Sequence, residues 1–322
     1  MIMIPKQNHR LLAWLDYFFV LRPMLFFPGW STLLAGYFID DNHRLLIPVS
    51  EILNHDFWPI MGLLIIFSMA MGMSFVLNQL QDVESDKGNK KLFIIAEERI
   101  PKNRIIIESL LLGSGAIILA FIYNLTVGIW LVLFIILTGI LYNFEPMRLK
   151  DKPWGSLLAN TLMGFFAFAI GWSAAHSGIA RLIRDALPYV FFNTALYFYT
   201  TLPDMKGDMQ AMKKTLAVIY GHKRVINWAF GFYVVALLSV FFLKDHMAWF
   251  IIVLSLPFFL ITVRNKDISS AVRNTKFSIL IFAGAVCLKW PFYLGIMIVL
   301  FFFTRWYYRA RFNFDYPNFK GI

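Results

Sequence analysis

Residues 59–86, PIMGLLIIFSMAMGMSFVLNQLQDVESD, join a long apolar segment to a polar loop. Residues 59–80 are long and apolar enough to cross the roughly 30 Å hydrocarbon core of a bilayer as one helix. The whole chain has this character, with 59% hydrophobic residues, 15% charged residues and a mean hydropathy of +0.64. A soluble domain averages about 45–50% apolar and 25% charged residues. The composition therefore predicts an integral membrane protein.

Similar apolar segments recur along the chain, near residues 24–39, 105–123, 127–142, 156–176, 186–203, 225–243, 247–263, 276–288 and 291–306. The last two are short and are separated only by Lys289-Trp290-Pro291, so they form either a tight hairpin or one kinked helix. No long linker interrupts the pattern. We therefore expect an all-α, polytopic membrane helix bundle of nine, or at most ten, transmembrane helices, with one domain over residues 1–322.

The net charge of +11 comes from basic residues that flank the apolar segments. With ten spans and a cytoplasmic N-terminus, 25 of the 30 Lys and Arg residues fall on the cytoplasmic side. This bias is the positive-inside signal of membrane proteins, so we expect membrane lipid and anionic substrates as partners and no nucleic acid. It predicts a location in the cell inner or plasma membrane, with the loops after residues 80 and 203 in the cytoplasm.

Three metal-capable side chains recur every four residues at the end of the opening stretch: Asn78, Asp82 and Asp86. On a helix this spacing places them on one face, and a straight helix spreads them over about 12 Å. One ion cannot contact all three at that span. The spacing suits two Mg²⁺ ions bridged by a diphosphate, or a helix that unwinds near Asp82.

A second acidic pair, Asp204 and Asp208, lies in Asp204-Met-Lys-Gly-Asp208 at the end of another apolar run. Taken alone, Asp86 or Asp208 is equally well read as an ordinary solvated loop acid. The matched position of two acidic clusters beside membrane segments instead indicates function. Because carboxylates repel a diphosphate, divalent metal ions must lie between the two.

A third motif, Tyr142-Asn-Phe-Glu-Pro-Met-Arg-Leu-Lys150, falls on the same predicted side of the membrane. Basic residues here and near the acidic motifs are candidates for diphosphate binding: Arg22, Lys90, Lys91, Arg148, Lys150, Lys206 and Lys214. The alternative for each is an anchor to anionic lipid. Loss of diphosphate from an allylic carbon leaves a carbocation, which needs π faces and exclusion of water. Tyr142 is the aromatic candidate for that role.

These motifs resemble those of the UbiA superfamily of intramembrane prenyltransferases, which includes 4-hydroxybenzoate and homogentisate polyprenyltransferases. The family pattern N-x3-D-x3-D matches Asn78, Asp82 and Asp86, and D-x3-D matches Asp204 and Asp208. Y-x3-P-x-R-L-K matches Tyr142 to Lys150, and an early R-P pair matches Arg22-Pro23. The order and spacing of the motifs agree with the family over about residues 20–225.

The resemblance implies about nine helices around a central cavity that opens sideways to lipid. It implies Mg²⁺-dependent transfer of a prenyl group from a polyprenyl diphosphate to a small hydrophobic or aromatic acceptor. Asn78, Asp82, Asp86, Asp204 and Asp208 would hold the metal ions, with Asp82, Asp204 and Tyr142 as catalytic residues. One departure is the loop Asn89-Lys90-Lys91-Leu92-Phe93, where many relatives have Asn-Lys-Pro.

Several alternatives stay open at this point. The acceptor is an aromatic ring, or alternatively a glycerophosphate lipid, a porphyrin or a carotenoid. A transporter or channel would use the same charges, but it predicts them at mid-membrane rather than at one edge. Cyclisation or hydrolysis of a diphosphate inside the bundle is a further enzymatic alternative.

Overall fold

The computed structural model describes residues 8–39, 56–83, 93–210, 212–243 and 245–317, and these contain helices and no strand. The first half has α1 (Asn8–Phe19), η1 (Pro23–Leu25), α2 (Phe26–Tyr37), α4 (Phe57–Gln81), α6 (Phe93–Ala96), α7 (Lys102–Tyr123), α8 (Leu125–Ile135), the π-helical η3 (Ile136–Leu141) and η4 (Leu149–Asp151). The second half has α9 (Pro153–Ala175), α10 (Leu182–Thr200), α11 (Met205–Gln210), α12 (Leu216–Tyr220), α13 (His222–Leu243), α14 (His246–Asn265), α15 (Ile268–Lys289) and α16 (Phe292–Phe312).

Seven helices in the described residues are long and apolar enough to cross a membrane. They are Leu12–Tyr37, which includes α1 and α2, and then α4, α7, α9, α13, α14 and α15. The shorter apolar helix Leu125–Leu141 and the helices α10 and α16 complete ten helical segments in the part of the chain that is described. The prediction of an all-α polytopic bundle is confirmed.

The last two apolar segments form two separate helices, α15 and α16, joined by a tight turn at Trp290 and Pro291. The Trp290 amide still donates to the Val286 carbonyl, and the Tyr293 amide donates to the Trp290 carbonyl. Proline lacks an amide hydrogen and is tolerated at the start of a helix, so α16 begins directly after it. The chain therefore forms two helices here, with a break at Trp290 and Pro291.

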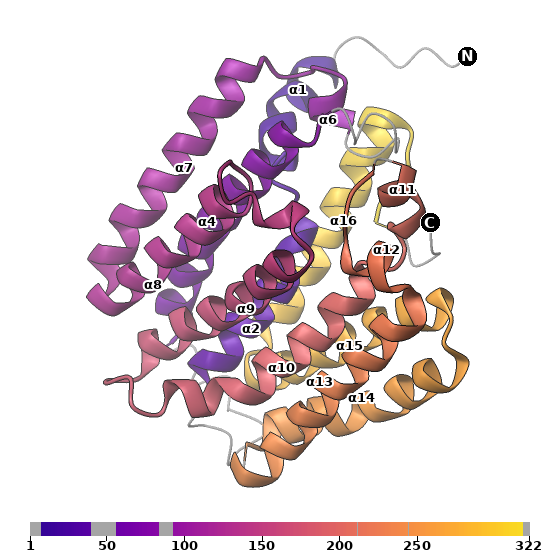
Figure 1. Ribbon diagram of the computed structural model, residues 1–322. Helices are drawn as coiled ribbons and strands as arrows, with labels where there is room; N and C mark the ends of the chain where they lie inside the picture. The colour runs from indigo at the N-terminus through magenta and orange to yellow at the C-terminus, as the bar shows by residue number, and fades with distance from the viewer. Residues whose placement is uncertain (1–7, 40–55, 84–92, 211, 244, 318–322) are drawn as a thin grey trace.

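The helices pack in a curved row, with α4, α7 and α8 at one side, α13, α14 and α15 at the other, and α2, α9 and α10 between them (Figure 1). The backbones of α2 and α9 approach each other closely. A Cβ added at Gly171 would lie 1.8 Å from the Leu33 carbonyl oxygen, and one at Gly36 would lie 2.2 Å from the Phe168 carbonyl oxygen. Small residues let membrane helices approach backbone to backbone, and this contact forms one wall of the site described below.

The two ends of the described chain are joined by a buried polar cluster. Tyr307 on α16 donates a 2.5 Å hydrogen bond to the Asp16 carboxylate on α1, and Arg311 makes two bonds of 3.0 and 2.6 Å to the same group. Asp16 is only 1% exposed, and these partners compensate for the loss of its contacts with water. The cluster gives the aromatic and basic C-terminal segment a structural role that the sequence left unassigned.

Candidate active site

A cavity of about 420 Å³ lies between α2, α4, η3, α9 and α10. Its apolar wall includes Phe67, Phe75 and Phe134. Polar side chains gather in the same lining: Arg22, Thr32, Ser74, Asn78, Thr138, Tyr142, Asn160, Asn193, Tyr197 and Thr200. A largely apolar chamber with a few convergent polar groups is the usual form of a small-molecule site.

The first acidic motif reaches this cavity at the end of α4. Asn78 lines the cavity, and α4 ends at Gln81 with Asp82 as its C-cap. The backbone of Asp82 no longer has α-helical dihedral angles, since its φ is −106° and its ψ is 12°. The sequence left open a straight helix or a helix that unwinds near Asp82. In the described part of the motif, the helix ends near Asp82. Asp86 lies outside the described residues.

The Tyr142–Lys150 loop brings a cation to that carboxylate. Lys150 Nζ is 2.9 Å from Asp82 Oδ1, and its side chain is only 7% exposed. The Lys150 amide donates to the Tyr142 carbonyl at 3.2 Å, which closes the loop. Tyr142 lines the cavity, and its phenol is neutral at neutral pH, as tyrosine ordinarily is. The loop thus places one charged and one aromatic side chain beside the first motif.

The second acidic motif follows α10. Asp204 is exposed in the turn after that helix, and Asp208 is half-buried in α11, with its amide donating to the Asp204 carbonyl at 2.8 Å. Tyr197 on α10 lies 2.6 Å from Ser156 on α9, between their hydroxyl oxygens. Tyr197 and Tyr142 both line the cavity, Tyr197 from α10 and Tyr142 from the turn that follows η3. The second motif therefore follows the cavity-lining helix α10, as the first motif follows the cavity-lining helix α4.

The predicted diphosphate-binding cations divide into distinct groups. Arg22 lines the cavity, and Lys150 pairs with Asp82. Arg148 is held inside its own loop, 2.6 Å from Asp151 and 4.0 Å from Glu145, and Lys214 is exposed between α11 and α12. Lys90, Lys91 and the Lys206 side chain lie outside the described part of the structure. Among the described candidates, Arg22 and Lys150 are the two that reach the site.

Other polar residues of the cavity had no signal in the sequence. Asn193 on α10 donates to the Thr32 hydroxyl on α2 at 2.9 Å, and Asn160 lies on the facing side of α9. A single polar residue within an apolar helix does not indicate a binding site from sequence alone, because the sequence does not show which face of the helix lines a cavity.

The donor atoms available suit a metal ion that is partly coordinated by substrate. In the described residues no three His, Cys, Asp or Glu side chains form a dedicated metal cage. The motifs instead offer carboxylates from two separate loops and the amide oxygen of Asn78. Mg²⁺ typically binds one or two carboxylates and completes its shell with waters and substrate phosphates. The residues present therefore fit Mg²⁺ carried by a phosphorylated ligand.

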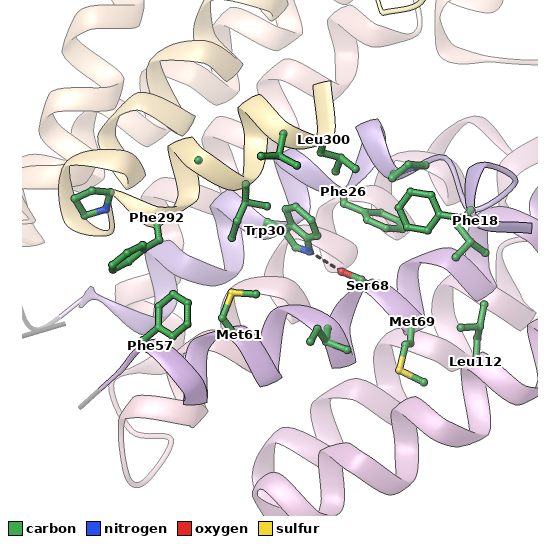
Figure 2. Close-up of a pocket in the computed structure, with 17 residues that line it drawn as sticks. Phe18, Phe26, Trp30, Phe57, Met61, Ser68, Met69, Leu112, Phe292 and Leu300 are labelled. Atoms are coloured by element: carbon green, nitrogen blue, oxygen red, sulfur yellow. Dashed lines mark hydrogen bonds between the residues drawn. The ribbon is translucent and has the colours of Figure 1, made fainter. Parts of the chain in front are cut away.

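A second, larger pocket of about 890 Å³ lies on the other side of the contact between α2 and α4. Figure 2 shows its apolar lining, with Phe57 and Phe292 at one end and Phe18 and Leu112 at the other. Trp30 donates a 2.9 Å hydrogen bond to Ser68 in this lining. Phe26 lines this pocket and stacks on Phe75 of the first cavity, so the two spaces share this aromatic wall.

Comparison with curated proteins identifies relatives with modest identity. The chain is 27% identical over 201 residues to a Digeranylgeranylglyceryl phosphate synthase of Sulfurisphaera tokodaii, covering 57% of this chain and 71% of the relative. It is 31% identical over 163 residues to a Homogentisate phytyltransferase of Synechocystis, covering 47% of this chain and 51% of the relative.

Solved structures share the fold. A UbiA homolog from Archaeoglobus fulgidus bound to DMAPP and Mg²⁺ has a TM-score of 0.62 at 18% identity, covering 84% of this chain and 99% of that one. A structure described as Digeranylgeranylglyceryl phosphate synthase in membranes has a TM-score of 0.64 at 18% identity, covering 89% and 99%. The model of the UbiA prenyltransferase family matches residues 47–283. This match covers most of the chain, and the protein is therefore a prenyltransferase of the UbiA family.

Proposed function

We propose that the protein transfers a prenyl group from a polyprenyl diphosphate to the hydroxyl group of a glycerophosphate acceptor within the membrane. The observation that carries the transfer chemistry is the ion pair of Lys150 with Asp82 at the end of α4, beside Asn78 and Tyr142, which both line the cavity. The glycerophosphate acceptor is supported by relatives from Sulfurisphaera tokodaii, Thermococcus sibiricus and Methanosphaera stadtmanae, which are all named Digeranylgeranylglyceryl phosphate synthase.

Asn78, Asp82, Asp204 and Asp208 are the described residues that would hold Mg²⁺, with Asp86 as a fifth. Mg²⁺ neutralises charge on a diphosphate and so makes it a better leaving group. The related Archaeoglobus fulgidus structures with DMAPP or GPP and Mg²⁺ support this assignment.

The remaining work falls to the residues of the cavity. Lys150 and Arg22 bind the diphosphate oxygens, since both present a cation beside the acidic motifs. Phe67, Phe75 and Phe134 exclude water from the allylic carbon, and the Tyr142 ring stabilises positive charge that develops there. The bond from carbon to the diphosphate oxygen breaks and its electron pair leaves with diphosphate. The acceptor oxygen bonds to that carbon, and the proton of the acceptor hydroxyl passes to the leaving diphosphate.

The loops that carry these residues face the cytoplasm in this proposal, and the membrane is the cell inner or plasma membrane. Support comes from the bias of Lys and Arg toward the loops that follow residues 80, 142 and 203. A donor with a long apolar tail is dissolved in lipid, while its diphosphate stays at the membrane surface. A site at the membrane edge meets both requirements.

An aromatic acceptor is the second candidate. The relative that favours it is the Homogentisate phytyltransferase of Synechocystis, at 31% identity. Ring alkylation needs only a nucleophilic carbon near the developing cation and a group that removes a proton. The same cavity and the same metal-binding residues serve both acceptors, so product analysis must distinguish them.

The test is a donor and acceptor panel with the purified protein in lipid, with Mg²⁺ or with EDTA. Labelled geranyl, farnesyl, geranylgeranyl and longer diphosphates are crossed with glycerophosphate and aromatic acceptors, and products are read by mass. We expect a Mg²⁺-dependent ether product from a glycerophosphate. A prenylated ring would establish the second candidate, and diphosphate release without prenyl transfer would contradict both.

Variants connect the activity to the site. Asp82→Ala and Asp204→Ala are each expected to abolish transfer while the protein remains folded. The matched control is Glu97→Gln, because Glu97 is a surface carboxylate that pairs with Arg99 and does not line the cavity. Full activity in Asp82→Ala or Asp204→Ala would contradict the metal-site assignment.

A further inference from the structure

Asn143 follows the candidate aromatic residue Tyr142 and is the most deeply buried residue of the Tyr142–Lys150 loop, with only 1% of its surface exposed. Its amide nitrogen donates to the carbonyl of Thr138 at 2.8 Å and to that of Gly139 at 3.3 Å. Its amide oxygen accepts a 2.9 Å hydrogen bond from the Asn78 side chain. One side chain therefore connects a helix end to a predicted metal ligand.

The two carbonyl bonds determine which way the Asn143 amide points. The last carbonyls of a helix have no amide partner within it, and η3 ends the helical path at Leu141. Carbonyl oxygens accept and cannot donate, so the NH₂ end of Asn143 must face Thr138 and Gly139. The oxygen end then faces Asn78. This assignment follows from backbone chemistry and does not depend on telling nitrogen from oxygen in the side chain.

The orientation of the Asn78 side-chain amide follows from that of Asn143. Because Asn78 faces the oxygen of Asn143, its NH₂ group must occupy that side, and its own oxygen points away from Asn143. Asn78 lines the cavity near the end of α4. Metal ions bind the oxygen of an amide and not its NH₂ group, so one of the two orientations of Asn78 can coordinate and the other cannot.

A second contact holds the two elements in register. Ser74, one turn before Asn78, lies 2.6 Å from Thr138 between their hydroxyl oxygens. Gly139 faces the flexible end of the Met73 side chain of α4, which would lie 2.9 Å from a Cβ there. The π-helical η3 is thus fastened to α4 at two levels, and π-helical turns occur frequently at functional sites.

We propose that Asn143 is a positioning residue that directs the Asn78 amide oxygen toward Mg²⁺. The inference rests on the proposed function and adds a residue that the acidic motifs do not include. Asn143 itself does not contact the metal ion. Groups that orient a metal ligand typically contribute 10–100-fold to metal affinity, and this sets the expected size of the effect.

The test measures Mn²⁺ binding with inorganic diphosphate present, by the loss of the free Mn²⁺ electron paramagnetic resonance signal. Asn143→Leu removes the amide with little change in volume and is expected to weaken Mn²⁺ binding 10–100-fold. Asn143→Ser is the second variant if the first does not fold, since its hydroxyl is too short to make all three bonds. Thermal unfolding in detergent reports folding for every variant.

Asn274 supplies the matched control. It is also a buried asparagine at a contact between two helices, bonded to Thr262 at 3.3 Å and to Ser278 at 2.8 Å, but it does not line the cavity. Asn274→Leu is expected to lower the unfolding temperature and to leave Mn²⁺ affinity unchanged. If Asn143 had a purely structural role, Asn143→Leu would likewise lower the unfolding temperature and leave Mn²⁺ affinity unchanged.

Two double variants test whether Asn143 acts through Asn78. In an Asn78→Ala background, Asn143→Leu should cause no further loss of Mn²⁺ affinity. In an Asn78→Asp background it should also have little effect, because a carboxylate offers oxygen in either orientation. Wild-type Mn²⁺ affinity in Asn143→Leu, or an additive loss in these backgrounds, would overturn the inference. If Asp82→Ala and Asn78→Ala also bind Mn²⁺ normally, the proposed function fails as well.

Discussion

Tyr142 is held beside the cavity by the turn that follows η3, and among the aromatic residues that line the cavity it is the closest in sequence to Lys150. Its neutral phenol carries no charge that could bind a diphosphate. We therefore expect Tyr142→Ala to lower turnover roughly 30-fold with a smaller change in donor affinity, because a desolvated contact between a cation and a ring contributes about 2 kcal/mol. Single-turnover rates and donor-binding isotherms measure the two effects separately.

Tyr142→Phe is the control for that experiment, since it keeps the π face and removes only the hydroxyl. It should retain most of the turnover if the ring stabilises the developing cation. A variant Tyr142→Ala that loses donor affinity alone, with normal single-turnover rates, would show that Tyr142 only packs against the bound donor.

At the scale of elements, the contact of α2 with α9 depends on two glycines. Gly171→Ala places a methyl group against the Leu33 carbonyl and is expected to reduce the free energy of unfolding by about 3 kcal/mol, because backbone atoms cannot move aside as a flexible side chain can. Gly284→Ala in α15 is the matched control: no atom lies within 4 Å of its Cβ, and the better helix former should be neutral or slightly stabilising. Unfolding in detergent compares the two, and equal stability would contradict the close helix contact.

The start of α15 gives a pH-dependent prediction. Asp267 caps this helix, accepting from the Ser270 hydroxyl at 2.6 Å and from the Ser270 amide at 2.7 Å, and these bonds lower the pKa of its carboxyl. A folded-state pKa below the unfolded value means that the stabilisation is present above the ordinary pKa of about 3.9 and is lost as pH falls through the folded-state value.

Asp267→Ala should accordingly lose about 1 kcal/mol of stability at pH 7, with the difference from wild type shrinking in acid. Asp267→Asn keeps a capping oxygen without a titrating group, so it should be close to wild type at neutral pH and lose the pH dependence. Chemical unfolding at a series of pH values tests both variants. A constant difference between wild type and Asp267→Ala across that range would contradict the role of the carboxylate.

The molecule as a whole is closed by the contact of α1 with α16 through Asp16. Arg311→Met leaves a carboxylate that is 1% exposed without its guanidinium partner and is expected to reduce stability by about 3–5 kcal/mol. The double variant Asp16→Asn with Arg311→Met should recover part of the loss, because no buried charge then remains. Thermal unfolding measures both, and equal stability of Arg311→Met and wild type would show that Asp16 is stabilised without the arginine.

The sequence alone predicted the apolar helices and the three motifs of the candidate site. A membrane helix is recognised from the length and the apolar composition of a single segment. Residues 59–80 therefore indicate a membrane helix whatever other segments they pack against. The spacing of Asn78 and Asp82, and the order of Tyr142 and Lys150 in their loop, are likewise properties of short stretches. The family resemblance drawn from these motifs agrees with the family match over residues 47–283.

The contacts between motifs were decided only by the tertiary structure. Lys150 reaches Asp82 while Arg148, two residues away, turns back to Asp151, and no local pattern separates those two cations. Asn143 and Asn78 are 65 residues apart, and Asn160 and Asn193 are single polar residues within apolar helices. The partners of such residues depend on how each helix is rotated about its axis in the bundle. That rotation follows from packing among many helices at once, as at Gly36 and Gly171, and is therefore not contained in any one segment.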